Sequence, residues 1–137
     1  MKSLLTTLLV IVLSFATMSA RGKAGAKVGV DFDATTYEFG NVSESGKPVS
    51  HTFTYTNTGT TPVAVLWAKT SCGCTEPVYE RKPLKPGEKA TVKVTFDPKG
   101  QRGEVDKDIR LRMRNGAGKS EEITLRLKGA VIPKNKK

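Results

Sequence analysis

The chain has 137 residues, with 23 Lys and Arg against 13 Asp and Glu, which gives a formal net charge of +10 at pH 7. One domain is expected at this length, and it can bury on the order of 65% of its unfolded surface without a metal or a disulfide. The charge favours anionic surroundings, but the chain lacks the interleaved aromatic and basic residues of single-strand binders. We therefore exclude nucleic acid as the expected partner.

Residues 1–20 have the pattern of a secretory signal peptide. Lys2 gives a basic start, residues 4–15 form an apolar run, and the residues that follow end at Ala20. The run is shorter than the ~20 residues that a membrane-spanning helix needs, so we expect no transmembrane span in the mature chain. We expect cleavage after Ala20, because the alternative motif Ala24-Gly25-Ala26 lies far from the apolar run. The protein is thus predicted to be exported, to the periplasm, the cell surface or the extracellular space.

The first predicted elements of the mature chain are strands. After a flexible lead-in at residues 21–27, apolar residues alternate at positions 28–32 and again at 37–42, which we interpret as one split edge strand. A turn at residues 43–48 leads into the clearest strand, residues 49–57. The positions expected on its core-facing side are Val49, His51, Phe53 and Tyr55.

Residues 62–68 are apolar on both faces, as a central strand would be. Trp67 in this segment is expected in the core, as a tryptophan is in immunoglobulin domains. Residues 77–81 form a short segment of ambiguous structure. The turn Lys85-Pro86-Gly87-Glu88 then leads into a strand at residues 90–96, because Pro presets its own φ and Gly accepts a positive φ.

A hairpin is predicted near the C-terminus, from strands at residues 105–114 and 121–131 with a loop at residues 115–119. This register brings opposite charges face to face. The expected pairs are Arg112 with Glu122, Asp108 with Arg126 and Asp106 with Lys128. Arg110 and Arg114 lie on the same outward face without a predicted partner, so they are the candidates for an anion-binding site.

These segments together predict an all-β fold, an immunoglobulin-like antiparallel β-sandwich of about seven strands. The sandwich is expected to span residues 28–132, because turn signals recur at regular spacing there and no helical period is found. Residues 133–137 form a basic tail.

Six landmarks in chain order resemble a bacterial secreted family known as domain of unknown function 1573. They are Tyr37-Glu38-Phe39-Gly40, His51-Thr52-Phe53, Thr56-Asn57-Thr58-Gly59, Ser71-Cys72-Gly73-Cys74-Thr75, Pro86-Gly87-Glu88 and Leu127-Lys128-Gly129. The resemblance covers nearly the whole mature chain, and residues 86–98 more loosely resemble the immunoglobulin-like modules of ciliary and centrosomal proteins. The family implies an exported β-sandwich and assigns no reaction.

Both cysteines of the chain lie in Cys72-Gly73-Cys74, and three hypotheses fit them. The first is a disulfide, because bridged Cα atoms lie about 4.4–6.8 Å apart and two extended steps of ~3.3 Å reach the top of that range. A kink at Gly73 would shorten the distance. Such a small loop constrains little of the unfolded chain, so the bridge is not expected to hold the fold together. An oxidised pair without turnover is favoured over the other two hypotheses.

The second hypothesis is a soft-metal site, in which the two thiolates bind Cu(I) and His51 or Met113 adds a ligand. Structural zinc is disfavoured, because a closed zinc site takes four ligands and His51 is the only histidine. The third hypothesis is thiol–disulfide exchange, although the spacing is one residue short of Cys-x-x-Cys and the chain has no βαβ pattern. No other cofactor is predicted.

The sequence contains no recognisable catalytic set. His51 shares a strand face with Phe53 and Tyr55, so it fits the edge of the core better than a Ser-His-Asp arrangement. We therefore predict a non-catalytic binding or assembly module whose partner is a protein or another cell-envelope component, with contact to an anionic surface as a further expectation. Soft-metal binding or thiol redox chemistry at Cys72 and Cys74 is the alternative.

Overall fold

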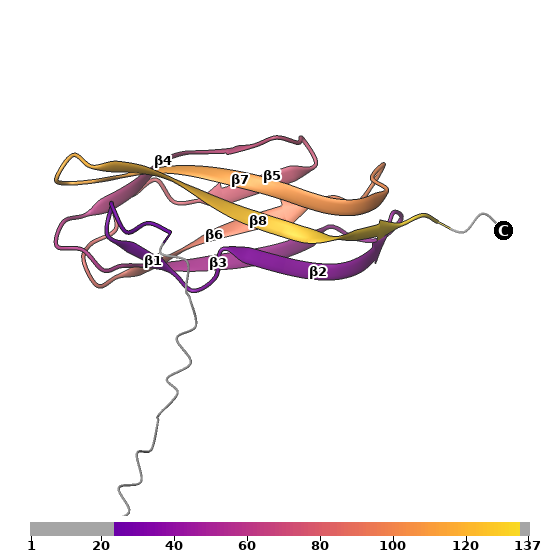
Figure 1. Ribbon diagram of the computed structural model, residues 1–137, viewed down its shortest axis with the longest axis horizontal. Coiled ribbons are helices and arrows are strands. Elements are labelled where there is room, and N and C mark those ends of the chain that lie inside the picture. The colour runs from indigo at the N-terminus through magenta and orange to yellow at the C-terminus, as the bar shows by residue number, and fades with distance from the viewer. Residues whose placement is uncertain (1–23, 135–137) are drawn as a thin grey trace, which may run out of the picture.

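The structure is a computed structural model and describes residues 24–134. These residues form eight strands in two four-stranded sheets packed face to face (Figure 1). The first sheet has the strand order β1-β3-β6-β5, and the second has the order β2-β8-β7-β4. The strands are β1 (Val30–Phe32), β2 (Thr36–Ser43), β3 (Val49–Asn57), β4 (Val63–Thr70), β5 (Thr75–Tyr79), β6 (Lys89–Phe96), β7 (Gly103–Asn115) and β8 (Ser120–Ile132).

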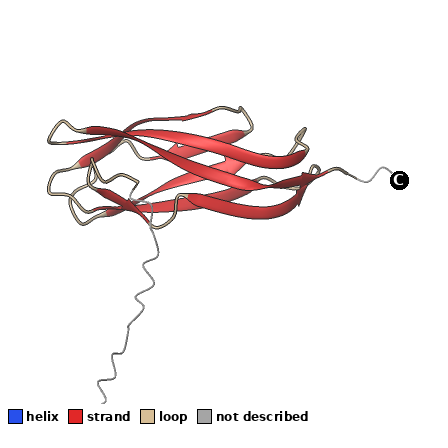
Figure 2. Cartoon of the chain, viewed as in Figure 1, coloured by secondary structure: helices blue, strands red, loops and turns tan. Residues whose placement is uncertain are grey.

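This architecture confirms the predicted all-β, immunoglobulin-like sandwich, with eight strands where about seven were expected. Figure 2 shows strands and loops alone over residues 24–134, and that part of the chain contains no helix that could cross a membrane. One strand pair departs from the predicted antiparallel pattern, because β2 runs parallel to β8.

The core lies between the two sheets, because apolar and polar residues alternate along the strands. On β3 the expected face is confirmed, with Phe53 and Tyr55 buried inside. The second sheet contributes Ile109 and Leu111 of β7 and Leu125 of β8, all fully buried. The β7–β8 register also matches the prediction in all three expected charge pairs.

The N-terminal segment differs from the expected split edge strand and flexible lead-in. β1 pairs with β3 in the first sheet, whereas β2 pairs with β8 in the second, so the chain changes sheets between them. Residues 24–29 form a turn in which the Glu121 carboxylate accepts hydrogen bonds from the amides of Gly25, Lys27 and Val28. Residues 24–27 are therefore anchored to β8. The predicted signal peptide, its cleavage site and residues 135–137 of the tail lie outside the described residues.

β4 was predicted as a central strand, and this prediction is wrong. β4 lies at the edge of the second sheet, where it pairs with β7 alone. A β-bulge skips Leu66, so Val65 faces Met113 but the next paired residue, Trp67, faces Arg112. An extra residue reverses the alternation of the strand that follows it. Trp67 is consequently half-buried outside the core, and Ala68 packs inside in its place.

Candidate functional site

The two cysteines lie in the loop of residues 71–74, which carries the chain from β4 in the second sheet to β5 in the first. The Thr70 hydroxyl lies 2.9 Å from the Cys72 carbonyl oxygen and 3.2 Å from that of Thr75. On the other side, the Asp97 amide donates to the Cys74 carbonyl at 2.8 Å. Because these anchors bond main-chain oxygens, they hold the path of the loop without using either sulfur atom.

A disulfide joins Cys72 and Cys74, whose Cα atoms are 5.2 Å apart. This distance is within the ordinary range for bridged cysteines. Gly73 is not one of the glycines with a positive φ, so the loop closes without the special backbone state that the sequence suggested. A Cβ atom at Gly73 would meet nothing within 4 Å. The disulfide therefore lies in an open loop with both cysteines half-buried.

The structure does not bring the proposed additional metal ligands to the loop. Met113 is fully buried and pairs with Val65, whereas the loop begins after Thr70, at the other end of β4. Within residues 24–134, no three His, Cys, Asp or Glu side chains lie close enough together to hold a metal ion. A soft ion at this loop would thus have only the two sulfurs as ligands, and it could bind only after the disulfide was reduced.

His51 lies at the edge of the core, as the strand pattern predicted. Its ring stacks on Tyr37 of β2 with a centroid distance of 3.8 Å and meets the Phe53 ring edge-on at 4.7 Å. Burial lowers the pKa of His51 below its ordinary value of 6.5, because the charged imidazolium loses hydration there. The histidine therefore joins the two sheets through aromatic contacts.

The lowered pKa of His51 predicts a loss of stability in mild acid. Below about pH 6.5 the unfolded chain binds the proton more readily than the folded chain, so the free energy of unfolding should fall as the pH falls from 7 towards 5. Urea unfolding of the wild type and of His51→Phe at both pH values measures this. The wild type should lose more stability than the variant, and an equal loss in both would contradict the assignment to His51.

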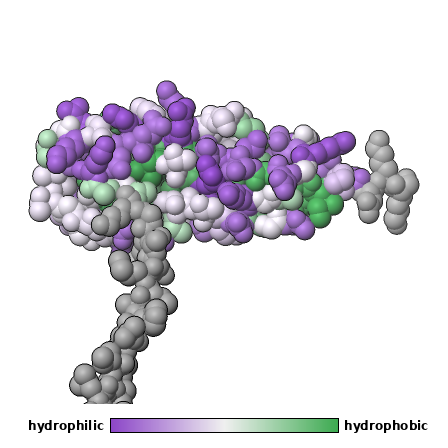
Figure 3. Space-filling view, in the orientation of Figure 1, coloured by the Kyte–Doolittle hydropathy of each residue, from purple (hydrophilic) through white to green (hydrophobic). Residues whose placement is uncertain are grey.

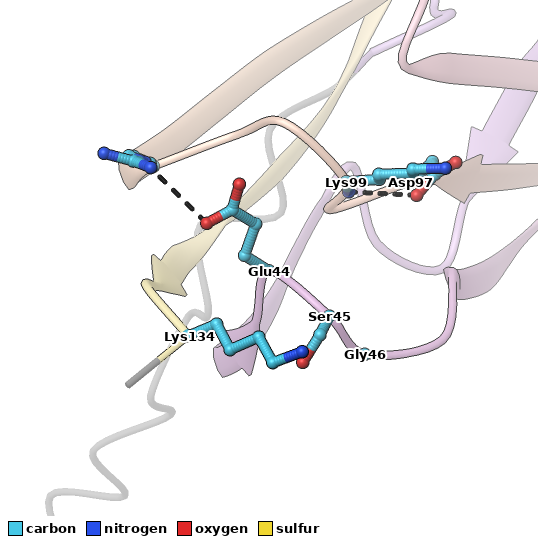
Figure 4. Close-up of a pocket in the computed structure, with 7 residues that line it drawn as sticks. Glu44, Ser45, Gly46, Asp97, Lys99 and Lys134 are labelled. Carbon is cyan, nitrogen blue, oxygen red and sulfur yellow. Dashed lines mark hydrogen bonds and ion pairs between the residues drawn. The ribbon is translucent and has the colours of Figure 1, made fainter. Parts of the chain in front are cut away.

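Charged loops surround a hollow of about 550 Å³ at the end of the sandwich where Asp97 contacts the cysteine loop (Figure 4). The lining residues are Glu44, Ser45, Gly46, Asp97, Lys99, Arg102 and Lys134. Arg102 lies 3.7 Å from the Glu44 carboxylate, and the Lys99 amide donates to Asp97 at 3.0 Å. Both acids of the hollow thus have a partner, Glu44 in an ion pair and Asp97 in a hydrogen bond from a main-chain amide.

A group of basic residues surrounds Trp67 on the outer face of the second sheet. Across the β4–β7 register, Trp67 faces Arg112, Lys69 faces Arg110 and Ala64 faces Arg114. The Lys69 ammonium lies 4.8 Å from the centroid of the Trp67 ring. We call this group the cationic–aromatic surface and define it as Trp67, Lys69, Arg110, Arg112 and Arg114.

The cationic–aromatic surface contains the two predicted anion-binding candidates but changes their description. Arg110, expected to lack a partner, lies 3.6 Å from Glu122, whereas Arg112, expected to pair with Glu122, only faces it in the register. Within residues 24–134, no ion pair within 4.0 Å involves Lys69, Arg112 or Arg114. Trp67 and Lys69 were not predicted as members of this surface. Their only signal in the sequence is the pair of adjacent large apolar residues at the bulge, Leu66 and Trp67.

The comparison with known families identifies the chain. A family model described as protein of unknown function (DUF1573) matches residues 30–131. The chain belongs to the DUF1573 family. The match extends from β1 into β8 and includes the cysteine loop, which confirms the family suggested by the sequence landmarks. A search of curated proteins found no match.

Solved structures share the fold of this DUF1573 protein at low sequence identity. The human CEP192 ASH/PapD-like domain 7 is 17% identical with a TM-score of 0.63, over 80% of this chain and 89% of that one. The VesB protease of Vibrio cholerae is 20% identical with a TM-score of 0.62, over 74% of this chain and 32% of that one. The periplasmic chaperone SfaE is 13% identical with a TM-score of 0.57, over 78% and 58%.

The present chain thus spans about a third of the VesB chain that it matches. At these identities the comparisons show the fold alone, an immunoglobulin-like domain of the kind found in an ASH/PapD-like domain and in a periplasmic chaperone.

Removal of the disulfide is expected to leave this DUF1573 fold intact. The bridge closes a ring of only three residues, so Cys72→Ala/Cys74→Ala should lose no more than about 1.5 kcal/mol of unfolding free energy. Urea denaturation followed by circular dichroism measures the loss, with the reduced wild type as the control. A double variant that failed to fold would show that the loop is needed for the sandwich.

Proposed function

We propose that this protein is an exported, non-catalytic immunoglobulin-like module that binds a protein or another component of the cell envelope. The observation that carries the binding proposal is the cationic–aromatic surface, where basic side chains that mostly lack ion-pair partners within residues 24–134 surround a half-exposed tryptophan. Tryptophan and arginine are the residue types that most often dominate binding energy at interfaces. Export rests on the sequence pattern of residues 1–20.

The arrangement of the reactive side chains supports binding over catalysis. Cys72 and Cys74 are bonded to each other, and the single histidine is stacked on Tyr37. A Cu(I) or thiol-redox function at the cysteine loop would first require a reductant for the disulfide. The cationic–aromatic surface needs no such step, so we place the function there.

Site-specific photo-crosslinking in the source organism tests this proposal. A photoreactive amino acid at Thr124 lies on the same outer face, because Thr124 is exposed and pairs with Arg110. It should give a discrete adduct with an envelope component. The matched control is Thr91, an exposed threonine of β6 in the first sheet. The exported protein should also have the intact mass of a chain without residues 1–20.

Besides the absence of a Thr124 adduct, two outcomes would contradict the binding proposal. The first is the same adduct pattern from Thr124 and Thr91, which would show contact without a preferred face. The second is saturable turnover of a small substrate that disappears when a polar side chain is replaced, which would make the protein an enzyme. An unprocessed chain retained in the cytoplasm would contradict the export part alone.

A further inference from the structure

The outer face of the second sheet is divided into two electrostatic halves. One half lies next to β2, which pairs with the C-terminal part of β8 from Arg126 onward. There Arg126 lies 2.9 Å from Asp108 and 3.5 Å from Asp106, so these charges are neutralised within the protein. In the half next to β4, the four basic residues of the cationic–aromatic surface form one ion pair within 4.0 Å among residues 24–134, that of Arg110 with Glu122. A negatively charged ligand is therefore attracted to the β4 half.

The arginines of this surface form a straight row with a fixed spacing. Arg110, Arg112 and Arg114 lie two residues apart on the outward side of β7. Two steps along a strand cover about 6.6–6.8 Å. Side chains on one side of another extended polypeptide recur with this same period. Acidic residues at every second position of an extended segment would thus meet all three arginines, whose planar guanidinium groups bind carboxylates through paired hydrogen bonds.

The surroundings of Trp67 disfavour ligands that need an open aromatic face. The Lys69 ammonium already lies over the ring, 4.8 Å from its centroid. Sugars and unpaired bases stack on aromatic rings, so this cation competes with them. Trp67 is only half-buried, so its indole can still contact the aliphatic part of a Glu side chain.

The distribution of apolar side chains disfavours a membrane surface as the ligand. Within residues 24–134, the exposed large hydrophobic residues are Leu66 of β4, Val78 of β5 and Ile132 of β8, on three different strands. In the view of Figure 3, with β7 and β8 toward the viewer, hydrophilic side chains predominate and the hydrophobic areas are small and separate. No continuous apolar area on this view resembles the broad face that an interfacial segment buries.

Strand addition at an edge is the other way in which a sheet binds an extended segment, but the four edge strands are poorly suited to it. β1 has three residues, β2 and β4 are interrupted by bulges, and β5 contains Pro77, which lacks an amide donor. Short strands, bulges and proline are the features that protect edges from pairing. The outer face, rather than an edge, is therefore the surface available to a partner.

We propose that the cationic–aromatic surface binds an extended acidic segment of a partner polypeptide, with acidic residues at alternate positions. The proposal rests on the proposed binding function and adds the chemistry of the partner. The segment lies along β7, its carboxylates meet the arginine row and Lys69, and its intervening side chains point to solvent.

Trp67 is the only tryptophan of the chain, so its fluorescence reports on this surface directly. The test uses two eight-residue peptides of equal composition, one with Glu and Thr alternating and one with four Glu followed by four Thr. The alternating peptide should bind more tightly and shift the Trp67 emission, and binding should weaken with added salt. Arg112→Gln should weaken it about tenfold. The control Lys93→Gln, an exposed residue of β6 in the other sheet, should change it less than about twofold.

Several results would overturn the acidic-segment proposal. Equal affinity for the two peptides would remove the role of spacing, and equal weakening by Arg112→Gln and Lys93→Gln would remove the role of this surface. Tighter binding of phosphatidylglycerol vesicles or of a sulfated polysaccharide, sensitive to Arg112→Gln, would assign another ligand class. That last result would leave the proposed binding function standing, whereas failure of the Thr124 crosslink would remove the function itself.

Discussion

Replacement of Asn57 by alanine is expected to lower the free energy of unfolding by about 3–5 kcal/mol. Asn57 is almost fully buried at the end of β3. Its side-chain amide donates to the carbonyl oxygens of Thr61 and Leu84, both at 2.9 Å, and its oxygen accepts from the Gly59 amide at 2.9 Å. Alanine would remove all three hydrogen bonds and leave a cavity, while the Leu84 carbonyl and the Gly59 amide would keep only their main-chain partners, Val63 and Gly29.

Urea denaturation of Asn57→Ala and of Asn41→Ala measures this effect. Asn41 is exposed on β2, so its replacement should cost less than about 0.5 kcal/mol. Asn57→Asp sharpens the test, because a carboxylate would face the Thr61 and Leu84 carbonyl oxygens. That variant should be unstable at pH 7 and partly recover in acid, where the protonated group can donate. Losses below 1 kcal/mol at Asn57 would show that water replaces the side chain.

The contacts of Asn57 also explain why two family landmarks occur together. The main-chain amide of Asn57 donates to the Glu88 carbonyl at 3.0 Å, and the Gly87 amide donates to the main-chain carbonyl of Asn57 at 2.8 Å. Gly87 has a φ of +83°, as the predicted turn required. The landmark at residues 56–59 thus binds the landmark at residues 86–88. Similarly, the landmark at residues 37–40 contacts His51 through the stacking of Tyr37.

The landmarks therefore mainly specify the fold. The cysteine loop is the exception. The Thr70 hydroxyl and the Asp97 amide hold its main chain without either sulfur atom, and Gly73 is open to its surroundings. The cationic–aromatic surface lies outside all six landmarks. A partner bound there would be recognised by residues that differ from those that define the family resemblance.

Much of the fold could be predicted from local patterns. The alternation of residues 49–57 and the length of the loop at residues 115–119 correctly gave β3 and the β7–β8 register. A change of sheet between β1 and β2 could not be predicted in this way, because both segments have the same alternating pattern. The alternating pattern indicates which side of a strand is apolar, but it does not indicate which of the two sheets the strand joins.

The candidate surface was missed for a similar physical reason. Residues 62–68 are apolar on both faces, so Trp67 was expected to point into the core from a central strand. The bulge at Leu66 reverses this direction, and it is fixed by the pairing of β4 with β7. Likewise, Arg112 and Glu122 were correctly predicted to face each other, but the ion pair forms diagonally with Arg110. Strand register was predictable, whereas side-chain direction at the bulge and rotamer choice on an exposed face were not.

The second large effect is expected for Gly129→Ala, which should lower the free energy of unfolding by about 2–3 kcal/mol. A Cβ atom on Gly129 of β8 would overlap the ring of Phe39 on the neighbouring β2 and lie 2.6 Å from its Cζ atom. The ring has little freedom to retreat, because it stacks on Phe96 of the first sheet with a centroid distance of 5.4 Å. Glycine at this position thus makes room for an aromatic contact between the sheets.

A double-mutant cycle separates this explanation from a backbone effect. In a Phe39→Ala background the space beside residue 129 is empty, so Gly129→Ala should cost nothing or stabilise by up to about 1 kcal/mol, because alanine is less flexible than glycine in the unfolded chain. Gly73→Ala is the matched control, since a Cβ atom there would meet nothing within 4 Å. If Gly129→Ala cost the same in both backgrounds, the requirement for glycine would lie in the β8 backbone and the Phe39 ring would not be its cause.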